Sequence, residues 1–333
     1  MSSPRAAVMM RLHAGSALAL ALHGSLAISP IPAAAQVLQL AVDGSPAGLD
    51  PHLITAFNSA QIVSGPIYEG LTGIDKDLRV VPGLAQSWQV SPDGKTLLID
   101  AAGPFGPWRS EFDYGEDVVS PYLWQRGIAR LDAVAITHGH SDHLGGLPSI
   151  LANFRPGELW LGPSPRTKAL ERVLATAREQ NVAVVELRGE DEFDFGGAHV
   201  RVLSPPRGWQ PAAEPRNNDS LVLHFACRGT AFLLEGDAES KMEPALAAQH
   251  PQAGLLKVAH NGSASSTSAQ FLAAVRPDFA VISVGARNPF RHPRAEVLNR
   301  LQTHRIATYR TDQSGAVTFY LDGVKVTPAS LPR

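Results

Sequence analysis

Four potential metal ligands lie close together in one short motif, Thr-His-Gly-His-Ser-Asp-His. They are His138, His140, Asp142 and His143. Imidazole nitrogens and carboxylate oxygens suit Zn²⁺ or Mn²⁺, and neither ion requires a thiolate. We expect His138 and His140 to reach one divalent metal ion, and Asp142 and His143 to reach a second ion nearby. We also expect Asp142 to take part in catalysis.

Two later residues can complete this site. Asp237 directly follows an apolar segment that ends in Leu233 and Leu234, where a loop carboxylate can face a site at the end of a strand. The alternative role of Asp237 is to cap the helix expected over residues 242–248. His260 follows an expected strand over 255–259 and precedes small residues, so it also lies at a strand end.

The elements that must position these side chains are short apolar strands that alternate with amphipathic helices, as in layered α/β proteins. We expect strands at 96–100, 131–136, 182–187, 198–203, 220–225, 231–234, 255–259 and 280–284. We expect helices at 165–180, 242–248, 266–275 and 294–303. Pro165 should occupy a first helical turn, where its missing N–H costs nothing. The histidine motif then directly follows a buried strand.

Composition narrows the class of protein. The 333 residues include 29 Lys and Arg against 31 Asp and Glu, and 44% are hydrophobic, which excludes a disordered tail. The near-neutral charge excludes a basic nucleic-acid coat, so any nucleic-acid contact must be a local patch. The single cysteine, Cys227, excludes an intramolecular disulfide and a cysteine-rich zinc finger. Any metal must therefore be held by histidine and carboxylate.

The N-terminal 35 residues are typical of a secretory signal peptide. Arg5 and Arg11 precede an apolar run over 14–28, and an Ala-Ala-Ala segment ends at residue 35. The run is short and interrupted by Gly and Ser, so it is a poor membrane span, although an uncleaved anchor is the alternative. No later segment approaches the ~20 apolar residues of a span, so we expect no membrane span after cleavage. The expected location is periplasmic or secreted.

Residues 36–94 resemble the start of the extracellular solute-binding proteins of peptide ABC transporters. The resemblance rests on Asp-Pro-His at 50–52, Tyr-Glu-Gly-Leu at 68–71 and Pro-Gly-Leu-Ala at 82–85. It covers only about sixty residues, whereas that family needs several hundred to enclose a peptide. We therefore interpret 36–94 as a short grafted extension without a peptide-binding role.

Residues 95–333 resemble the metallo-beta-lactamase superfamily, and within it the hydrolase domain of ComEC-type DNA-internalisation competence proteins. Besides the histidine motif, the resemblance is carried by Leu-Ile-Asp-Ala-Ala-Gly at 98–103, Asn-Asn-Asp-Ser at 217–220, Leu-Leu-Glu-Gly-Asp at 233–237 and Lys-Val-Ala-His at 257–260. It implies an α/β fold, a four-layer αββα sandwich that binds two divalent ions. It also implies that Asp237 bridges both ions and that His260 completes the second site.

The chain departs from that family at three points. Asn261 stands where a second consecutive histidine is usual, and Asn217 lies in a segment where many superfamily members supply another histidine. The usual opening strand with its Gly-Gln-Gly-Asp loop is absent. A hairpin over 88–99, turning at Asp93-Gly94, and a strand over 37–42 are the expected substitutes.

The resemblance predicts a phosphodiesterase or nuclease acting on DNA or another phosphodiester. We expect His292 to bind or protonate the leaving oxygen, unless it is an ordinary loop histidine. Three side chains are expected to donate hydrogen bonds to phosphate: Asn217, Ser220 and Ser263. ComEC-type proteins carry a membrane channel beside this domain, so DNA transport would need a separate channel protein as a partner.

Two alternatives stay open. One is a metallohydrolase of a small ester or lactam, and the other is an inactive chimeric product. Two polar residues outside the motif are given structural roles: we expect Lys257 to be a strand-edge charge and His224 to face solvent from its strand.

Overall fold

The computed structural model describes residues 72–74, 80–82, 95–103, 112–285 and 288–329. Contacts within the chain divide it into two compact units, one over Val8–Val90 and one over Met1–Ala7 with Ser91–Arg333. In the first unit, β1 (Thr72–Ile74) pairs antiparallel with β2 (Val80–Pro82). The expected signal peptide, the 37–42 strand and the 91–94 turn lie outside the described residues.

The second unit begins with a parallel sheet in the order β3-β4-β5-β6. Its strands are β3 (Leu97–Ile99), β4 (Ala133–Ile136), β5 (Glu158–Leu161) and β6 (Ala183–Glu186). Every residue of β4 is buried, which is why this strand reads as a continuous apolar run. The helices around this sheet include α2 (Ser120–Gln125), α3 (Ser141–Leu144), α4 (Leu147–Phe154) and α5 (Lys168–Glu179), with a π-helical turn at Gly115–Val119 before α2.

A mixed sheet follows in the order β13-β12-β11-β10-β9-β8-β7. Its strands are β7 (Glu192–Phe195), β8 (Ala198–Ser204), β9 (Val222–Cys227), β10 (Thr230–Leu234), β11 (Leu255–Lys257), β12 (Phe279–Ile282) and β13 (Ala307–Arg310). β7 to β10 pair antiparallel, and β10 to β13 pair parallel. The later helices are α6 (Glu243–Ala247), α7 (Ala269–Val275), α8 (Ala295–Thr303) and α9 (Thr311–Ser314), and β14 (Phe319–Leu321) forms a hairpin with β15 (Val326–Pro328).

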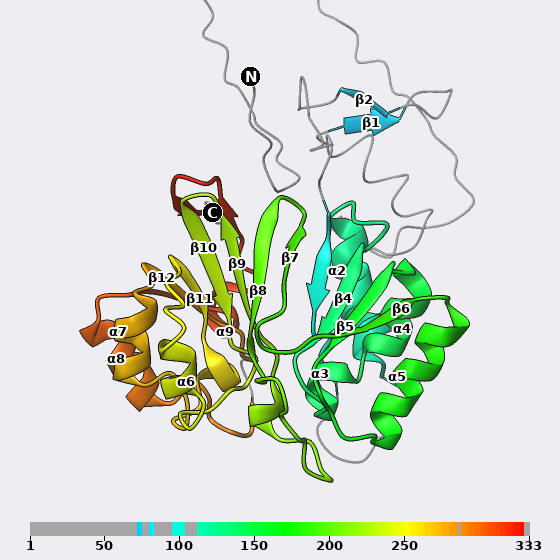
Figure 1. Ribbon diagram of the computed structural model, residues 1–333. Coiled ribbons are helices and arrows are strands. Elements are labelled where there is room, and N and C mark those ends of the chain that lie inside the picture. The colour runs from blue at the N-terminus through cyan, green and yellow to red at the C-terminus, as the bar shows by residue number, and fades with distance from the viewer. Residues whose placement is uncertain (1–71, 75–79, 83–94, 104–111, 286–287, 330–333) are drawn as a thin grey trace, which may run out of the picture. The chain divides into compact units, whose positions relative to one another are not determined.

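The two large sheets pack face to face, with helices on both outer faces (Figure 1). The layer between the sheets contains Ala135 and Trp160 from one sheet and Val202 and Leu223 from the other. Alternate residues of the same strands, such as Val134, face the cluster formed with α4 and α5. α6, α7 and α8 cover the outer face of the mixed sheet. The four-layer αββα sandwich that the resemblance implies is therefore confirmed.

Some local expectations were wrong. α5 begins at Lys168 after the N-cap Thr167, whose side chain accepts from the Leu170 amide, so Pro165 precedes the helix. Lys257 ends β11, an interior strand, and its Nζ donates to the Val258 carbonyl 2.9 Å away, so it is not a strand-edge charge.

His224 does not face solvent. It is 6% exposed, because the loop before β11 covers its face of the sheet, and its Nε2 donates to the Gln252 carbonyl at 2.9 Å. Among the helices of the described part of the chain, we find no segment with the length and hydropathy needed to span a bilayer.

Candidate metal centre

Two ring nitrogens face each other directly after β4. His138 Nε2 lies 2.7 Å from His140 Nδ1. The Nε2 atom of His140 lies 3.0 Å from the carbonyl oxygen of Pro215 and must carry the hydrogen, since a carbonyl only accepts. In a neutral His140 ring, Nδ1 therefore has only a lone pair, and that lone pair is directed at His138.

The partners of His138 leave its facing nitrogen in the same state. The Thr137 hydroxyl donates to Asp100 Oδ2 at 2.8 Å, so it can accept from His138 Nδ1 at 3.2 Å. Nε2 of a neutral His138 is then also a lone pair. Two lone pairs 2.7 Å apart repel each other unless a cation lies between them. With these tautomers, the two facing nitrogens can bind a cation. The Pro215 carbonyl holds His140 in place, and Asp100 holds His138 through the Thr137 hydroxyl.

Asp100 fixes the orientation of a third imidazole. Its Oδ1 accepts from the Thr137 amide, and its Oδ2 lies 2.8 Å from His143 Nδ1. Nε2 of His143 consequently points toward Asp237 Oδ2 at 3.3 Å and Asp142 Oδ2 at 3.7 Å. A carboxylate behind a metal-binding imidazole sets both the tautomer and the ring direction. Sequence reasoning did not assign this role to Asp100, although the residue was part of a quoted motif.

Asp237 enters the same space from the end of β10. Gly236 precedes it with a φ of +56°, and a Cβ at Gly236 would lie 2.9 Å from Ser220. This close approach lets the Asp237 amide donate to Ser220 Oγ at 3.0 Å. Asp237 is not a helix cap, because Met242 caps α6. Its Oδ2 also lies 3.8 Å from His260 Nε2.

Burial and the charges of neighbouring side chains shift the pKa values of three residues of the cluster. Burial, together with the neighbouring His143, lowers the pKa of His138 well below its usual value. Burial alone would lower the pKa of His143, but the carboxylates of Asp100 and Asp237 outweigh it and raise that pKa well above the usual value. Burial likewise opposes ionisation of Asp237, yet His143 and His138 lower its pKa. Asp237 is therefore an anion at neutral pH.

The donor atoms fit a divalent metal ion. The ligand atoms of His138, His143 and Asp237 all lie within 4.8 Å of one another, and all three residues are buried. In the described part of the chain, neither His143 Nε2 nor Asp237 Oδ1 has a hydrogen-bond partner. A buried polar atom without a partner is costly, and a bound ion would satisfy both.

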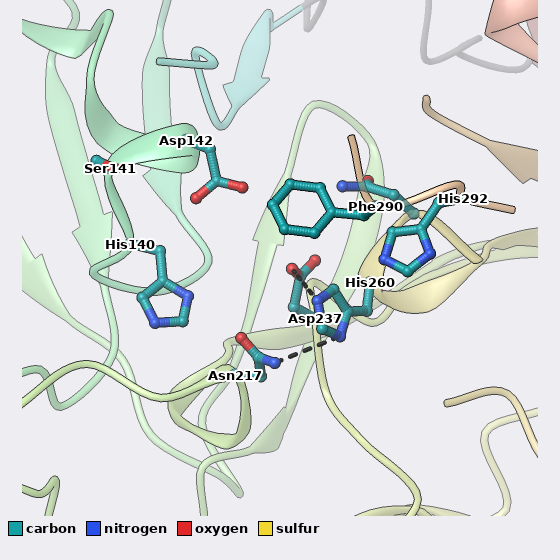
Figure 2. Close-up of a pocket in the computed structure, with 9 residues that line it drawn as sticks. His140, Ser141, Asp142, Asn217, Asp237, His260, Phe290 and His292 are labelled. Atoms are coloured by element: carbon teal, nitrogen blue, oxygen red, sulfur yellow. Dashed lines mark hydrogen bonds and ion pairs between the residues drawn. The ribbon is translucent and has the colours of Figure 1, made fainter. Parts of the chain in front are cut away.

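A pocket of about 380 Å³ opens over this cluster. Its lining residues are His140, Ser141, Asp142, Asn217, Asp237, His260, Asn261, Phe290 and His292. Figure 2 shows His140 and Asp142 on the α3 side, and Asp237, His260 and His292 across from them. Four of the six expected metal ligands line the pocket: His140, Asp142, Asp237 and His260. A fifth, His143, lies next to Asp237. The sixth, His138, lies 2.7 Å from His140 through their facing nitrogens and belongs to the buried cluster with His143 and Asp237.

The expected substrate-binding residues fall in three different places. Asn217 lines the pocket, and its amide donates to Glu239 Oε1 at 3.2 Å and lies 3.3 Å from His260 Nδ1. Ser220 is completely buried and accepts from Asp237, so its position suits holding the loop rather than touching substrate. Ser263 lies outside the pocket lining and pairs with Ser265.

Three residues at this site adopt the left-handed backbone conformation. Asp100 has a φ of 55°, and the consecutive residues His260 and Asn261 have φ values of 49° and 52°. Residues other than glycine adopt this left-handed region at a cost, and such residues gather at functional sites. The conformation is held partly by the His260 amide, which donates to the Gly236 carbonyl at 3.1 Å.

Comparisons with known proteins show the family of this chain. The family model "Metallo-beta-lactamase superfamily" matches residues 80–286. "ComE operon protein 3" of Bacillus subtilis is 35% identical over 67% of this chain and 30% of its own length. "Recombination protein 2" of Haemophilus influenzae is 31% identical over 71% of this chain and 28% of its own length. The chain thus spans less than a third of these relatives.

The short N-terminal stretch has separate relatives. The "Dipeptide-binding protein" of Escherichia coli is 38% identical over 66 residues, which are 20% of this chain and 12% of that protein. Among solved structures, the metallo-beta-lactamase fold protein YhfI of Bacillus subtilis is 12% identical with a TM-score of 0.40, covering 64% of this chain and 93% of its own. On the family match and its αββα architecture, the chain belongs to the metallo-beta-lactamase superfamily and has the metal-dependent hydrolase fold of that superfamily.

Proposed function

We propose that this chain is an exported, dinuclear metal-dependent phosphodiesterase that acts on DNA or another phosphodiester. The donor set supports two ions of Zn²⁺ or Mn²⁺, because it consists of imidazole and carboxylate. Relatives named "ComE operon protein 3" and "Competence protein ComA" support a role connected with competence.

The observation that carries the proposal is the placement of Asp237 between two groups of donors. His143 lies 3.3 Å from Asp237 on one side, and His260 lies 3.8 Å from it on the other. His138, His140 and Asp142 would complete the coordination on the α3 side. A bound pair of divalent ions would lower the pKa of a water ligand and would stabilise charge on the phosphoryl group.

The chain's own residues then bind and orient the substrate. Burial and the neighbouring His260 lower the pKa of His292, so its imidazole is neutral at pH 7 and can donate one N–H to a substrate oxygen. Asn217 offers amide hydrogens from the pocket wall. Asp142 lines the same pocket, where it can accept a proton from the attacking water.

The N-terminal 35 residues carry the export part of the proposal. Their charged, apolar and small-residue segments predict cleavage after export, so the mature enzyme would be periplasmic or secreted. N-terminal sequencing of protein recovered from the periplasm or the medium tests this, with a new N-terminus near Gln36 as the expected result. A separate membrane channel protein is the partner we propose for DNA transport.

The activity is tested on purified chain supplied with Mn²⁺ or Zn²⁺. We expect cleavage of single-stranded and double-stranded DNA or of a simple phosphodiester, and no turnover of nitrocefin or a carboxylic ester panel. His260→Ala should reduce this cleavage, because His260 is a proposed metal ligand, and His304→Ala, which changes an exposed histidine after α8, is its matched control. Hydrolysis of the lactam or ester panel without phosphodiester cleavage would support the alternative hydrolase. Metal-loaded chain that hydrolyses neither would contradict the proposal.

A further inference from the structure

One wall of the metal pocket is an aromatic ring, although the other lining residues are polar. Phe290 is 43% exposed and lines the pocket together with histidine, aspartate, asparagine and serine side chains. Its ring stacks on His292 with the centroids 5.9 Å apart and the planes at 18°. His292 in turn lies 5.6 Å from His260, a proposed metal ligand. The aromatic face is therefore two rings away from the metal cluster.

The loop that carries Phe290 is tied down on both sides. The Asn288 side chain accepts from the His292 amide and donates to the His292 carbonyl, both at 2.8 Å. The Asn288 side-chain amide also donates to the Gly285 carbonyl at 2.9 Å. Further along, the Arg294 amide donates to the Gly262 carbonyl at 2.9 Å, which joins the loop to the His260 segment. Phe290 thus lies between Asn288 and His292, two residues that these hydrogen bonds hold together.

We propose that Phe290 stacks on the nucleobase next to the scissile phosphodiester and so makes this chain prefer nucleotide substrates with an accessible base. This inference rests on the proposed phosphodiesterase function. In a nucleotide, the base is one sugar away from the phosphorus, and Phe290 lines the pocket in which that phosphorus would sit, near His260 and His292 (Figure 2). Every base offers a π face, so stacking is tolerant of sequence.

Stacking on Phe290 also requires that the base of the nucleic acid is not already stacked in a duplex. A base inside a duplex is already stacked on both faces, and placing it on a protein ring means unstacking it at a cost of a few kcal/mol. Unpaired segments and frayed ends do not incur most of this cost. The inference therefore assigns to Phe290 a preference for single-stranded over double-stranded nucleic acid.

The test compares two minimal substrates that differ only in the base. One is the dinucleoside monophosphate of thymidine, and the other is its analogue in which both bases are replaced by hydrogen. Each contains one phosphodiester, so kcat/KM reports one cleavage. Because a stacked base contributes about 1–3 kcal/mol, wild-type chain should favour the base-bearing substrate about 5- to 150-fold.

Variants separate the ring from the rest of the site. Phe290→Ala should abolish most of that preference, Phe290→Tyr should keep it, and Tyr320→Ala, which alters a partly exposed aromatic residue of β14, should leave it unchanged. Metal content should be the same in all four proteins, because Phe290 is not a ligand. The single-strand preference over a duplex of the same sequence should shrink in Phe290→Ala in parallel.

Two results would overturn this inference while leaving the phosphodiesterase function intact. They are a wild-type chain that cleaves both substrates equally well, and a Phe290→Ala variant that keeps the full preference. A metal-loaded wild-type chain that cleaves no phosphodiester would instead overturn the proposed function itself.

Discussion

Replacing Asp100 by asparagine should weaken metal binding although Asp100 is not itself a ligand. Asp100 accepts from the Thr137 amide and hydroxyl and from His143 Nδ1, with all three distances at 2.8 Å. An asparagine can keep one of the Thr137 contacts, but it loses the negative charge that orients His143. It also removes the carboxylate that holds the Thr137 hydroxyl as a donor, which leaves the His138 tautomer without its support.

The size of the effect follows from the same contacts. Loss of a carboxylate behind a metal-binding imidazole typically reduces metal affinity about 10- to 100-fold. That range corresponds to about 1.4–2.7 kcal/mol of binding free energy. The assay is a competition titration of Zn²⁺ between metal-free chain and a chromophoric chelator of known affinity, run on wild type and Asp100→Asn.

Asp132→Asn is the matched control. Asp132 precedes the same strand, β4, at its other end, and its Oδ2 accepts from the Thr96 amide at 2.8 Å. This control should cost stability without changing Zn²⁺ affinity. If Asp100→Asn folds and binds Zn²⁺ as tightly as wild type, the orienting role assigned to Asp100 is refuted.

Three further predictions concern stability, each measured as the free energy of unfolding in urea. Burial lowers the pKa of His224 in the folded chain, whereas in the unfolded chain this histidine titrates near its usual value. The stability of wild type should therefore fall as the pH drops from about 7.5 to about 5, and the stability of His224→Gln should fall less. Equal slopes of stability against pH would contradict this. Ser220→Ala should cost about 1–3 kcal/mol, since it leaves the buried Asp237 amide unpaired, and a neutral outcome would count against that contact. Trp160→Ala should cost about 3–5 kcal/mol, because the indole fills the space between the sheets. Its control, Val184→Ala on exposed β6, should change stability by less than about 0.5 kcal/mol. Similar costs for the two variants would refute the assigned core.

Much of the fold could be predicted from the sequence because many strands include a short run of apolar residues. Such runs lie between turns, and the structure has a strand at each of the eight positions expected, with ends that shift by up to two residues. Three strands of the two large sheets were not predicted: β5, whose apolar run is only Leu159 to Leu161, and β7 and β13. β7 alternates charged and aromatic residues over only four positions, and β13 includes a single large aromatic residue among polar ones, so neither shows an apolar run.

The metal ligands could be predicted because they share one short motif or follow apolar strands. Their supporting residues could not. Asp100 ends a strand like many acids on protein surfaces, and only the pairing of β3 with β4 places it against His143. Phe290 lies in a loop without periodicity, so nothing in the sequence connects it with His140 and Asp142 across the pocket.

The errors at His224 and Lys257 have a common physical cause. Alternation along a strand correctly shows which residues share a face, and Leu223 and His224 do lie on opposite faces of β9. Alternation does not show what covers the second face or which strands become neighbours. Here the loop before β11 covers His224, and β10 and β12 flank the strand of Lys257.

The central claim is that His138, His140, Asp142, His143, Asp237 and His260 together bind a pair of divalent ions. The most direct measurement is the metal content of purified chain by mass spectrometry, for wild type and for a His138→Ala/His140→Ala double variant. We expect about two equivalents of divalent metal per wild-type chain and the loss of at least about one equivalent in the variant. Less than one equivalent in metal-supplied wild type, or the same content in both proteins, would contradict it.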